Sequence, residues 1–373
     1  MKICKYILYL IFVAMLWVPL AQMKFQFIEE ESLGGAYTQP EKPDFQVKNW
    51  FDGSFQNGYE KYLNDTLGFH KTMVFDRNLF YYKVFHQSTA NGIVIGKNDI
   101  LYEENYLKTR NGDDYLGHIE IKRITKQLKD LQDDLSRKGK TLIVCLAPSK
   151  GDFFAEYIPK RYQRATTDST NYKQFSKALA AVGVNVIDYN AWFLAQKKTA
   201  KYPLYPPYGI HWSEYGMTVA SDSLISYIES IRKTRIPHLI IDGYERSLEP
   251  LSSDFDIGNT VNLPEGILKN SPLYYPKWRW ESDSTLERLR MISIADSYYW
   301  QLFNIGFQNH CVDGQFWYYN NTIYPDSYQK DITTKDIDVR KSIYDADIVM
   351  IVATCPNLKD IGWGILEELR MEN

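Results

Sequence analysis

The stretch MISIADSYYW, residues 291–300, passes from an apolar run to an Asp-Ser pair and then to aromatic residues. The run Met291–Ala295 has the length and the isoleucine content of a buried β-strand. A helix is predicted to begin at about Tyr298. Asp296 and Ser297 would then lie at the carboxyl end of the strand, which is the edge where open α/β sheets bind their ligands.

Two explanations account for an Asp-Ser pair at this position. Both residues are common helix N-caps, and taken alone the pair is explained by capping. Alternatively, the serine is a nucleophile, because the first helical N–H groups and the helix dipole favour a developing negative charge. The pattern G-x-S-x-G is absent, so the nucleophile elbow of α/β-hydrolases is not indicated.

The rest of the chain alternates helices with strands. Apolar positions at helical spacing predict a helix from Gly117 to Lys138: Ile119, Ile121, Ile124, Leu128, Leu131 and Leu135. A strand-like run, TLIVCLA, follows at 141–147. The alternation continues with helices at 170–182, 213–231, 298–307 and 362–369, and with strands at 184–190, 291–295 and 347–354. This order predicts an α/β fold with a mainly parallel central sheet covered on both faces.

The region before this alternation divides into shorter pieces. Residues 26–44 are polar and contain two prolines, as linkers do. Two short helices separated at Gly68 are expected between residues 50 and 85, and a strand pair at 91–102. We therefore expect a signal segment at 1–23, a linker at 24–48 and one large domain at 49–373.

The N-terminus has the layout of a signal peptide or a signal anchor. Lys2 and Lys5 precede an apolar run from Tyr6 to Ala21, slightly shorter than the ~20 residues of a full membrane span. Cleavage after Ala21 would place Pro19 where a small residue belongs. We favour an uncleaved anchor with the lysines inside and the remainder exported, and a cleaved signal peptide is the alternative.

An exported domain lies in an oxidising compartment, where its cysteines can form disulfides, and the chain has four cysteines. Cys4 would remain on the cytoplasmic side, and Cys145 lies in a predicted buried strand. The spacing leaves open a bridge between Cys311 and Cys355. No pair of cysteines has the CxxC spacing of a structural zinc site.

Composition excludes one class of partner and hints at another. A formal net charge of -3 gives no electrostatic footprint for nucleic acid. The excess of aromatic residues, 29 Tyr, 18 Phe and 9 Trp, suits stacking on sugar rings, although aromatic side chains also fill cores.

Of the six histidines, His211 has the most suggestive setting. It lies in YPPYGIHWSEYG, a loop rich in proline and aromatic residues, just before a predicted helix. Imidazole gains and loses a proton near neutral pH, so it suits a general base for a serine nucleophile. The alternative is an ordinary hydrogen-bonded histidine in a loop.

Four motifs in order carry a family resemblance: VIGKNDILY, LAPSKGDFFAEYIP, GIHWSEYG and IADSYYW. Together they resemble the alginate O-acetyltransferase family, the AlgX/AlgJ-like proteins, over about Trp50 to Leu369. The resemblance implies an SGNH-hydrolase-like three-layer fold. It also implies a periplasmic enzyme that receives acetyl groups from a membrane-bound O-acyltransferase and moves them onto exported polysaccharides. The chemistry expected of such an enzyme needs no metal or other cofactor.

The resemblance also assigns site residues. Ser297 matches the nucleophile of the family's GDS-like motif, in which Ala295 replaces the glycine, and His211 matches the histidine of its D-x-H-W motif. The aspartate of that motif is replaced by Gly209. Three substitutes for its role stay open: a Ser-His dyad, a backbone carbonyl, or another acid such as Asp296 or Glu214. Composition suggests the oxyanion donors only as candidates: Asn320, Asn321 and Asn357.

We therefore expect an O-acetyltransferase that acts on a cell-surface polysaccharide or exopolysaccharide through an acetyl-Ser297 intermediate. Two alternatives remain: a catalytically silent scaffold that binds polysaccharide or the acyltransferase, which the missing aspartate favours, and a carbohydrate esterase. The aromatic clusters at 274–280 and 316–321 are stacking platforms or ordinary packing. Lys150 either contacts an acidic glycan or is a solvated lysine.

Overall fold

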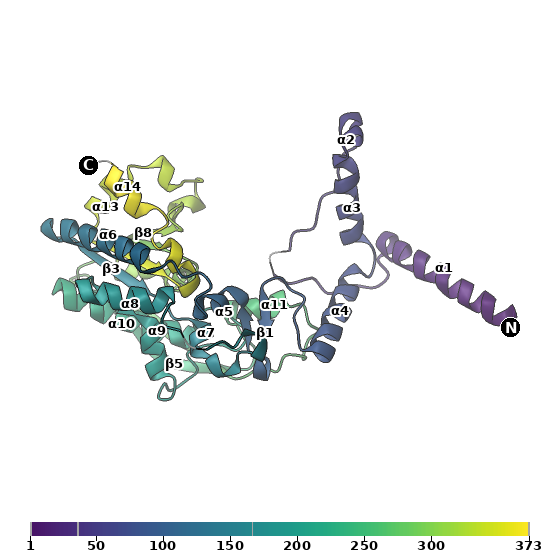
Figure 1. Ribbon diagram of the computed structural model, residues 1–373, viewed down its shortest axis with the longest axis horizontal. Helices are drawn as coiled ribbons and strands as arrows, with labels where there is room; N and C mark the ends of the chain where they lie inside the picture. Colours follow the sequence, from purple (N-terminus) through teal and green to yellow (C-terminus); the bar gives the residue numbers. More distant parts are fainter. Residues whose placement is uncertain (1, 36, 166, 372–373) are drawn as a thin grey trace. The chain divides into compact units, whose positions relative to one another are not determined.

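The computed structural model describes residues 2–35, 37–165 and 167–371. The described chain divides into two units. The first contains residues 1–95 and 256–269, and the second contains residues 96–255 and 270–373. Figure 1 shows the chain coloured from its N-terminus to its C-terminus.

A six-stranded sheet forms the centre of the second unit. Its strands lie in this order: β4 (Val186–Asp188), β3 (Thr141–Leu146), β10 (Ile348–Ala353), β7 (Arg290–Ala295), β8 (Asp313–Tyr318) and β9 (Thr322–Tyr324). The first five strands are parallel, and β9 is antiparallel to β8. The prediction of a mainly parallel sheet is confirmed, and β7 lies inside it between β10 and β8.

One face of the sheet packs against four helices, α6 (His118–Arg137), α8 (Asn171–Val182), α13 (Val339–Asp345) and α14 (Ile365–Met371). Every residue of β3 and β10 is buried. Because successive side chains of a strand point to opposite faces, Val144, Ile294 and Ile351 share one core cluster with these helices. Burial on both faces explains why the strands read as continuous apolar runs.

The opposite face carries α9 (Tyr189–Gln196), α10 (Glu214–Arg232) and α12 (Tyr299–Asn304). The crossover β3–α8–β4 moves from the centre of the sheet toward the β4 edge, and the crossover β7–α12–β8 moves toward the opposite, β9 edge. Since such connections are right-handed, α8 and α12 cover opposite faces. Helix α10 contacts α12, and α9 contacts β3, so the sheet has a helical layer on each side.

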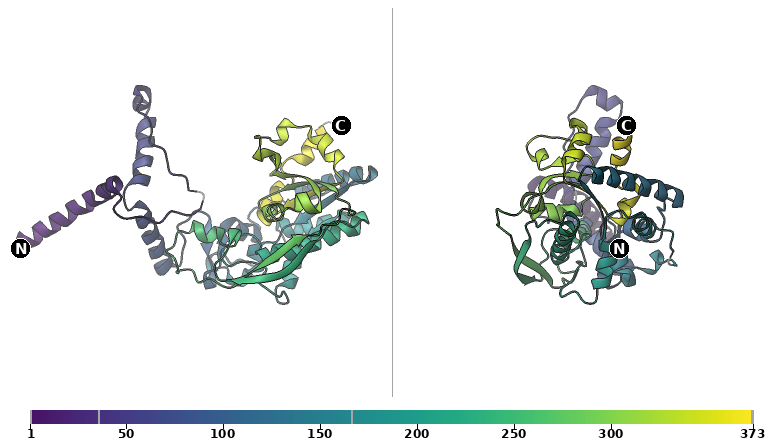
Figure 2. Two further views of the ribbon diagram at one scale, coloured as in Figure 1. Left: turned by 180° about the vertical axis from the view of Figure 1, so that it is seen from behind. Right: turned by 90° about the vertical axis from the view of Figure 1, so that its left-hand side faces the viewer.

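Several elements of the second unit lie outside this sandwich. They are β2 (Leu101–Glu103), α5 (Glu104–Arg110), α7 (Lys150–Phe153), the strands β5 (Leu239–Ser247) and β6 (Leu273–Trp280), and a 3₁₀ helix at Ser252–Phe255. Figure 2 shows β5 and β6 as a long antiparallel pair. This pair was not predicted from the sequence, because both strands carry charged residues and lack a regular alternation of apolar and polar residues.

The first unit is mainly helical. It contains α1 (Lys2–Phe25), α2 (Val47–Phe51), α3 (Ser54–Thr66), α4 (His70–Phe85), β1 (Ile93–Ile95) and α11 (Asp256–Thr260). The Glu30 carboxylate accepts hydrogen bonds from the backbone of Phe69 and Thr72 and so caps the start of α4. The Asn78 side chain donates to the carbonyl oxygen of Val261, which ties α4 to the end of α11.

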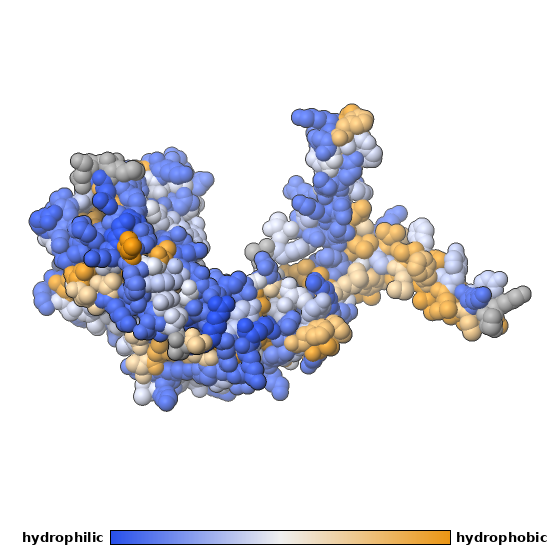
Figure 3. Space-filling view, viewed as in Figure 1, coloured by the Kyte–Doolittle hydropathy of each residue, from blue (hydrophilic) through white to orange (hydrophobic). Residues whose placement is uncertain are grey.

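Helix α1 exposes its apolar side chains. Its residues from Ile3 to Phe25 form a helix long and apolar enough to cross a membrane, at the end of the chain where signal sequences also occur. Leu8 and Phe12 are 66% and 61% exposed. Figure 3 shows the apolar surface along this helix. A helix of this kind is compatible with either a membrane anchor or a signal sequence.

Most expected elements appear, and two details differ. Helix α6 covers the predicted span, but Ile119 is 89% exposed and does not belong to the buried stripe as predicted, because it lies in the first turn, off the face that meets the sheet. The thiols of Cys311 and Cys355 are both free and buried, so the disulfide left open by the spacing is not formed. The break expected at Gly68 is confirmed between α3 and α4.

The packing of α6 predicts a contrast between two truncations on one helix. Leu128→Ala removes a fully buried side chain from the core cluster and is expected to lower the free energy of unfolding by about 2–5 kcal/mol. Ile119→Ala is the control and should change it by less than about 0.5 kcal/mol. Urea denaturation of the two variants measures the difference. Equal losses would contradict the assignment of the buried face.

Candidate functional site

The site is built where β7 ends. Ser297 follows this strand by two residues, and its Oγ lies 3.1 Å from Nε2 of His211. Both residues are partly exposed, so a substrate can reach them from solvent. A serine hydroxyl within hydrogen-bond reach of an imidazole nitrogen is the arrangement of a nucleophile and its general base.

The hydrogen bonds separate the two explanations of the Asp-Ser pair. Asp296 Oδ1 accepts from the backbone N–H of Tyr298 at 3.1 Å, so the aspartate, not the serine, satisfies the start of the turn that precedes α12. Helix α12 has no side-chain cap at its own N-terminus. Capping therefore does not explain Ser297, whose hydroxyl faces His211 instead.

Asp296 itself is fully buried and holds the turn after β10. Its Oδ2 accepts hydrogen bonds from the backbone N–H and the hydroxyl of Thr354, each 2.7 Å long, and from Nδ2 of Asn357 at 2.8 Å. With both oxygens engaged by these donors, Asp296 joins the ends of β7 and β10. It is a structural anchor beside Ser297.

The residue after Ser297 fixes the residue before His211. The Tyr298 hydroxyl donates to the carbonyl oxygen of Ile210 at 2.7 Å and shares a 2.8 Å hydrogen bond with the Tyr205 hydroxyl. Burial and the neighbouring Tyr205 raise the pKa of Tyr298, so its hydroxyl stays protonated and remains a donor. The two halves of the site are thus joined by their immediate neighbours as well as by the Ser297–His211 contact.

Both expectations for Lys150 are wrong. Neither a solvated lysine nor a contact for an acidic glycan fits it, because its side chain is 0% exposed. Its Nζ donates to the carbonyl oxygens of Pro207, at 2.9 Å, and of Gly209. Lys150 begins the short helix α7, which Ser149 caps, so the PSK motif holds the loop that carries His211.

Gly209 is enclosed by backbone. A Cβ at this position would collide with the carbonyl oxygen of Ser253 and lie 2.9 Å from the carbonyl carbon of Asp254. Both partners are main-chain atoms and cannot move aside like a flexible side chain. No residue with a side chain, aspartate included, fits here without displacing the 253–254 segment.

The other candidate residues have partners of their own. Glu214, the first residue of α10, accepts a 3.2 Å hydrogen bond from Gln301, and burial raises its pKa. The Asn357 amide binds Asp296 and Thr354. The Asn320 amide donates to the carbonyl oxygen of Trp363 at 3.2 Å. Of these three, only Asn357 belongs to the hydrogen-bond network beside Ser297.

The aromatic clusters serve mainly as packing. Phe316 and Trp317 are fully buried in β8. Tyr274 in β6 stacks on Tyr202 with ring centroids 3.8 Å apart. Trp278 stays 39% exposed on the outer strand pair.

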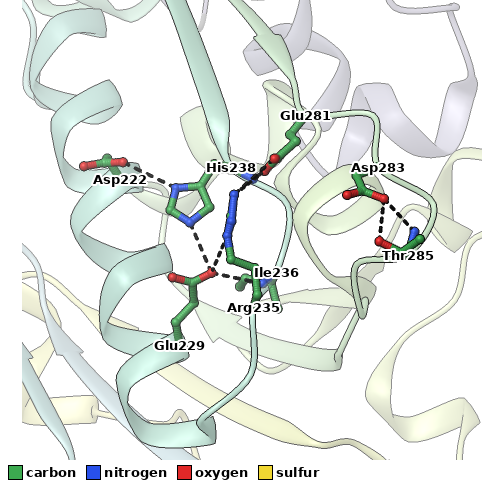
Figure 4. Close-up of polar contacts among 8 residues, drawn as sticks. All are labelled: Asp222, Glu229, Arg235, Ile236, His238, Glu281, Asp283 and Thr285. Atoms are coloured by element: carbon green, nitrogen blue, oxygen red, sulfur yellow. Dashed lines mark hydrogen bonds and ion pairs between the residues drawn. The ribbon is translucent and has the colours of Figure 1, made fainter.

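His238 illustrates a histidine with a structural role. Figure 4 shows its imidazole beside Glu229, whose Oε1 lies 3.1 Å from Nε2, and Asp222. Arg235 adds an ion pair to Glu281 at 2.9 Å. These contacts tie the end of α10 to β5 and to the end of β6, and no hydroxyl nucleophile takes part. Across the described ranges, no group of three or more His, Cys, Asp or Glu side chains is placed to hold a metal ion.

Sequence reasoning missed the residues that support the pair. Thr354, Tyr298 and Lys150 position Ser297 and His211, but each acts through a contact with residues distant in sequence. Thr354 directly follows a buried strand at the same sheet edge as Ser297, and this position is the one signal that could have indicated it.

The Asp296 network predicts a large effect from a small change. Asp296→Asn replaces one accepting oxygen by a donor, which leaves at least one buried donor unsatisfied. The free energy of unfolding is expected to fall by about 1–3 kcal/mol. The control Asp130→Asn alters an exposed pair with Lys126 and should cost about 0–1 kcal/mol. Thermal or urea unfolding measures both, and an Asp296→Asn variant as stable as the control would contradict the network.

The chain shares sequence and fold features with known proteins. Residues 93–237 match the family described as SGNH hydrolase-like domain, acetyltransferase AlgX. This segment includes His211 and ends before Ser297. Among curated protein sequences, none matches this chain.

Three solved structures are similar. The O-acetyltransferase domain of Pseudomonas putida AlgJ is 16% identical, with a TM-score of 0.50, over 76% of this chain and 100% of that one. Pseudomonas aeruginosa AlgX is 12% identical over 72% and 67% of the two chains, with a TM-score of 0.46. Bacillus cereus PatB1 with a sulfonyl adduct is 12% identical over 73% and 97%, with a TM-score of 0.44. The AlgJ likeness shows that the chain shares the fold of this domain, and residues 93–237 carry the match to the SGNH hydrolase-like, AlgX-type family model.

Proposed function

We propose that the protein is an O-acetyltransferase that acetylates an exported cell-surface polysaccharide or exopolysaccharide through an acetyl-Ser297 intermediate. The observation that carries the proposal is the 3.1 Å contact between Ser297 Oγ and His211 Nε2 at the carboxyl edge of the central strand β7. The family match and the AlgJ-like fold support acyl transfer as the reaction class.

In the first half-reaction, His211 Nε2 takes the proton of the Ser297 hydroxyl as Oγ attacks the acetyl carbonyl carbon. A bond forms between Oγ and that carbon, and the bond to the donor's leaving group breaks. The leaving group receives the proton from His211, which returns to its neutral form. The hydrogen bonds around Asp296 and Tyr298 hold both residues in place, so little reorganisation precedes the step.

In the second half-reaction, a sugar hydroxyl takes the place of the leaving group. His211 removes its proton while the sugar oxygen attacks the acetyl carbon of the ester. The Oγ–carbon bond breaks, and Ser297 regains a proton from His211. The acetyl group ends on the sugar, and the enzyme is restored.

The carbonyl oxygen carries negative charge in both half-reactions and needs hydrogen-bond donors. Among the amides expected from composition, Asn357 is the better candidate, because it belongs to the network of Asp296, next to Ser297. Its Nδ2 donates to Asp296 and Thr354, so it would exchange one of these bonds for the carbonyl oxygen. Asn320 donates to the Trp363 carbonyl oxygen and lies outside this network.

The export of the domain is part of the proposal. Lys2 and Lys5 lie at the start of helix α1, before its exposed apolar run, which suits a periplasmic domain anchored to the inner membrane with its lysines in the cytoplasm. A domain held at the membrane would meet its acetyl donor there, and a membrane-bound O-acyltransferase is the supplier we propose.

Acylation of Ser297 tests the catalytic proposal. The full chain in detergent is exposed briefly to p-nitrophenyl acetate, and intact mass spectrometry with peptide mapping locates the adduct. One acetyl group on Ser297 is expected. Ser297→Ala should abolish it, and His211→Gln should slow its formation by about 10²–10⁴-fold, the usual contribution of a general base.

Ser293→Ala is the matched control, because Ser293 is a fully buried serine in β7, the strand that precedes Ser297, and its substitution should leave acylation unchanged. No adduct on a folded wild-type chain would contradict the catalytic proposal and favour a binding scaffold. An adduct that passes only to water, in the presence of polysaccharide acceptors, would favour an esterase.

The anchor gives a separate prediction. After cell fractionation, the full chain should sediment with membranes and resist extraction by alkaline carbonate, as an inserted helix does. N-terminal sequencing should begin within the first residues of the chain. A start after residue 20 together with a soluble protein would contradict the anchor and identify a cleaved signal peptide.

A further inference from the structure

We propose that Asp254 is the positioning acid of the Ser297–His211 pair, supplied by the segment that excludes a side chain at Gly209. This assignment deepens the proposed function, since it names the group that orients the base. A histidine base with Nε2 toward a serine carries its proton on Nδ1, and a carboxylate near Nδ1 fixes that tautomer and stabilises the imidazolium. Such a group is worth about 10⁴ in rate in a Ser-His-Asp triad.

The other acids named for this role are engaged elsewhere. Asp296 accepts from Tyr298, Thr354 and Asn357. Glu214 accepts from Gln301. Position 209, two residues before His211, cannot carry an acid, because backbone atoms fill the space around it. The positioning acid therefore has to come from another segment.

The segment that fills this space contains an aspartate. The main chain of Ser253 and Asp254 lies directly against Gly209, and Asp254 is only 1% exposed. An aspartate so deeply buried needs nearby donors or positive charge. Lys150, which binds the Gly209 carbonyl oxygen, supplies one positive charge on this side of the loop. The imidazolium of His211 supplies a second during acyl transfer.

Hydrogen bonds through Leu251 connect the backbone of Asp254 to β6. Its backbone N–H donates to the carbonyl oxygen of Leu251 at 3.1 Å, and the Leu251 N–H donates to the Tyr275 hydroxyl at 2.8 Å. Burial and the charge of Asp254 raise the pKa of Tyr275. A short turn pinned in this way holds its acid as rigidly as a residue within a regular element, which is what a positioning group needs.

The test reads the tautomer of His211 directly. Nitrogen-15 spectra of the imidazoles are recorded for the full chain in detergent, and His211→Gln identifies the signals of His211. The wild type should carry the proton on Nδ1 and leave Nε2 unprotonated. Asp254→Asn should shift the population toward the Nε2–H form. Glu214→Gln, the same carboxylate-to-amide change three residues from His211, is the control and should leave the spectrum unchanged.

Kinetics supply the second readout. Asp254→Asn should slow acylation of Ser297 by about 10²–10⁴-fold, mostly in kcat, whereas the control Glu214→Gln should have little effect. An unchanged tautomer in Asp254→Asn would overturn the proposal and leave Asp254 as a counter-charge for Lys150. If this variant does not fold, the wild-type spectrum alone tests the proposal, because an Nε2–H tautomer of His211 in the wild type would overturn it.

The two proposals fail in distinguishable ways. A wild type that does not acylate Ser297 contradicts the transferase, while the tautomer still tests Asp254. A wild type that acylates normally, with an Asp254→Asn variant of equal rate and tautomer, contradicts only the role of Asp254.

Discussion

The carboxylate of Asp296 is the contact on which the site depends. It is fully buried, and its oxygens accept hydrogen bonds from Thr354, Asn357 and the backbone of Tyr298. These hydrogen bonds join the segments that follow the carboxyl ends of β7 and β10. The burial of this carboxylate is possible because protein hydrogen-bond donors replace the water molecules that it loses. Because Ser297 is the next residue, the hydrogen bonds of Asp296 also fix the position of its backbone.

Hydrogen bonds to the backbone also position His211, on the other side of the site. The loop that carries His211 has no regular structure, yet Lys150, Tyr298 and Tyr205 fix it through carbonyl oxygens and hydroxyl groups. Gly209 lets the 253–254 segment approach this loop more closely than any side chain would allow. The side chain of His211 can thus be as well placed on a loop as on a helix, because the backbone on both sides of it is held by hydrogen bonds.

Much of the fold followed from local patterns, but only part of the site did. The apolar runs of β3, β7 and β10 predict a buried parallel sheet, and the stripe on α6 predicts its covering helix. Ser297 and His211 were predicted as neighbours from a strand end and a motif, and the structure places them 3.1 Å apart. The support from Thr354 and Lys150, and the space around Gly209, arise from contacts between distant segments, which no local pattern encodes. The strand pair β5–β6 was missed because its charged, half-exposed strands lack a period of two.

The measurement that tests the central claim most directly follows one acetyl group through the reaction. The chain is acetylated with a carbon-13-labelled acetyl ester, separated from the excess reagent and mixed with oligosaccharides of cell-surface polymers. Transfer predicts that the label leaves Ser297 and appears as an ester on a sugar hydroxyl, detectable by NMR. Label that appears only as free acetate, or that never enters Ser297 of a folded protein, would contradict the assignment as an O-acetyltransferase.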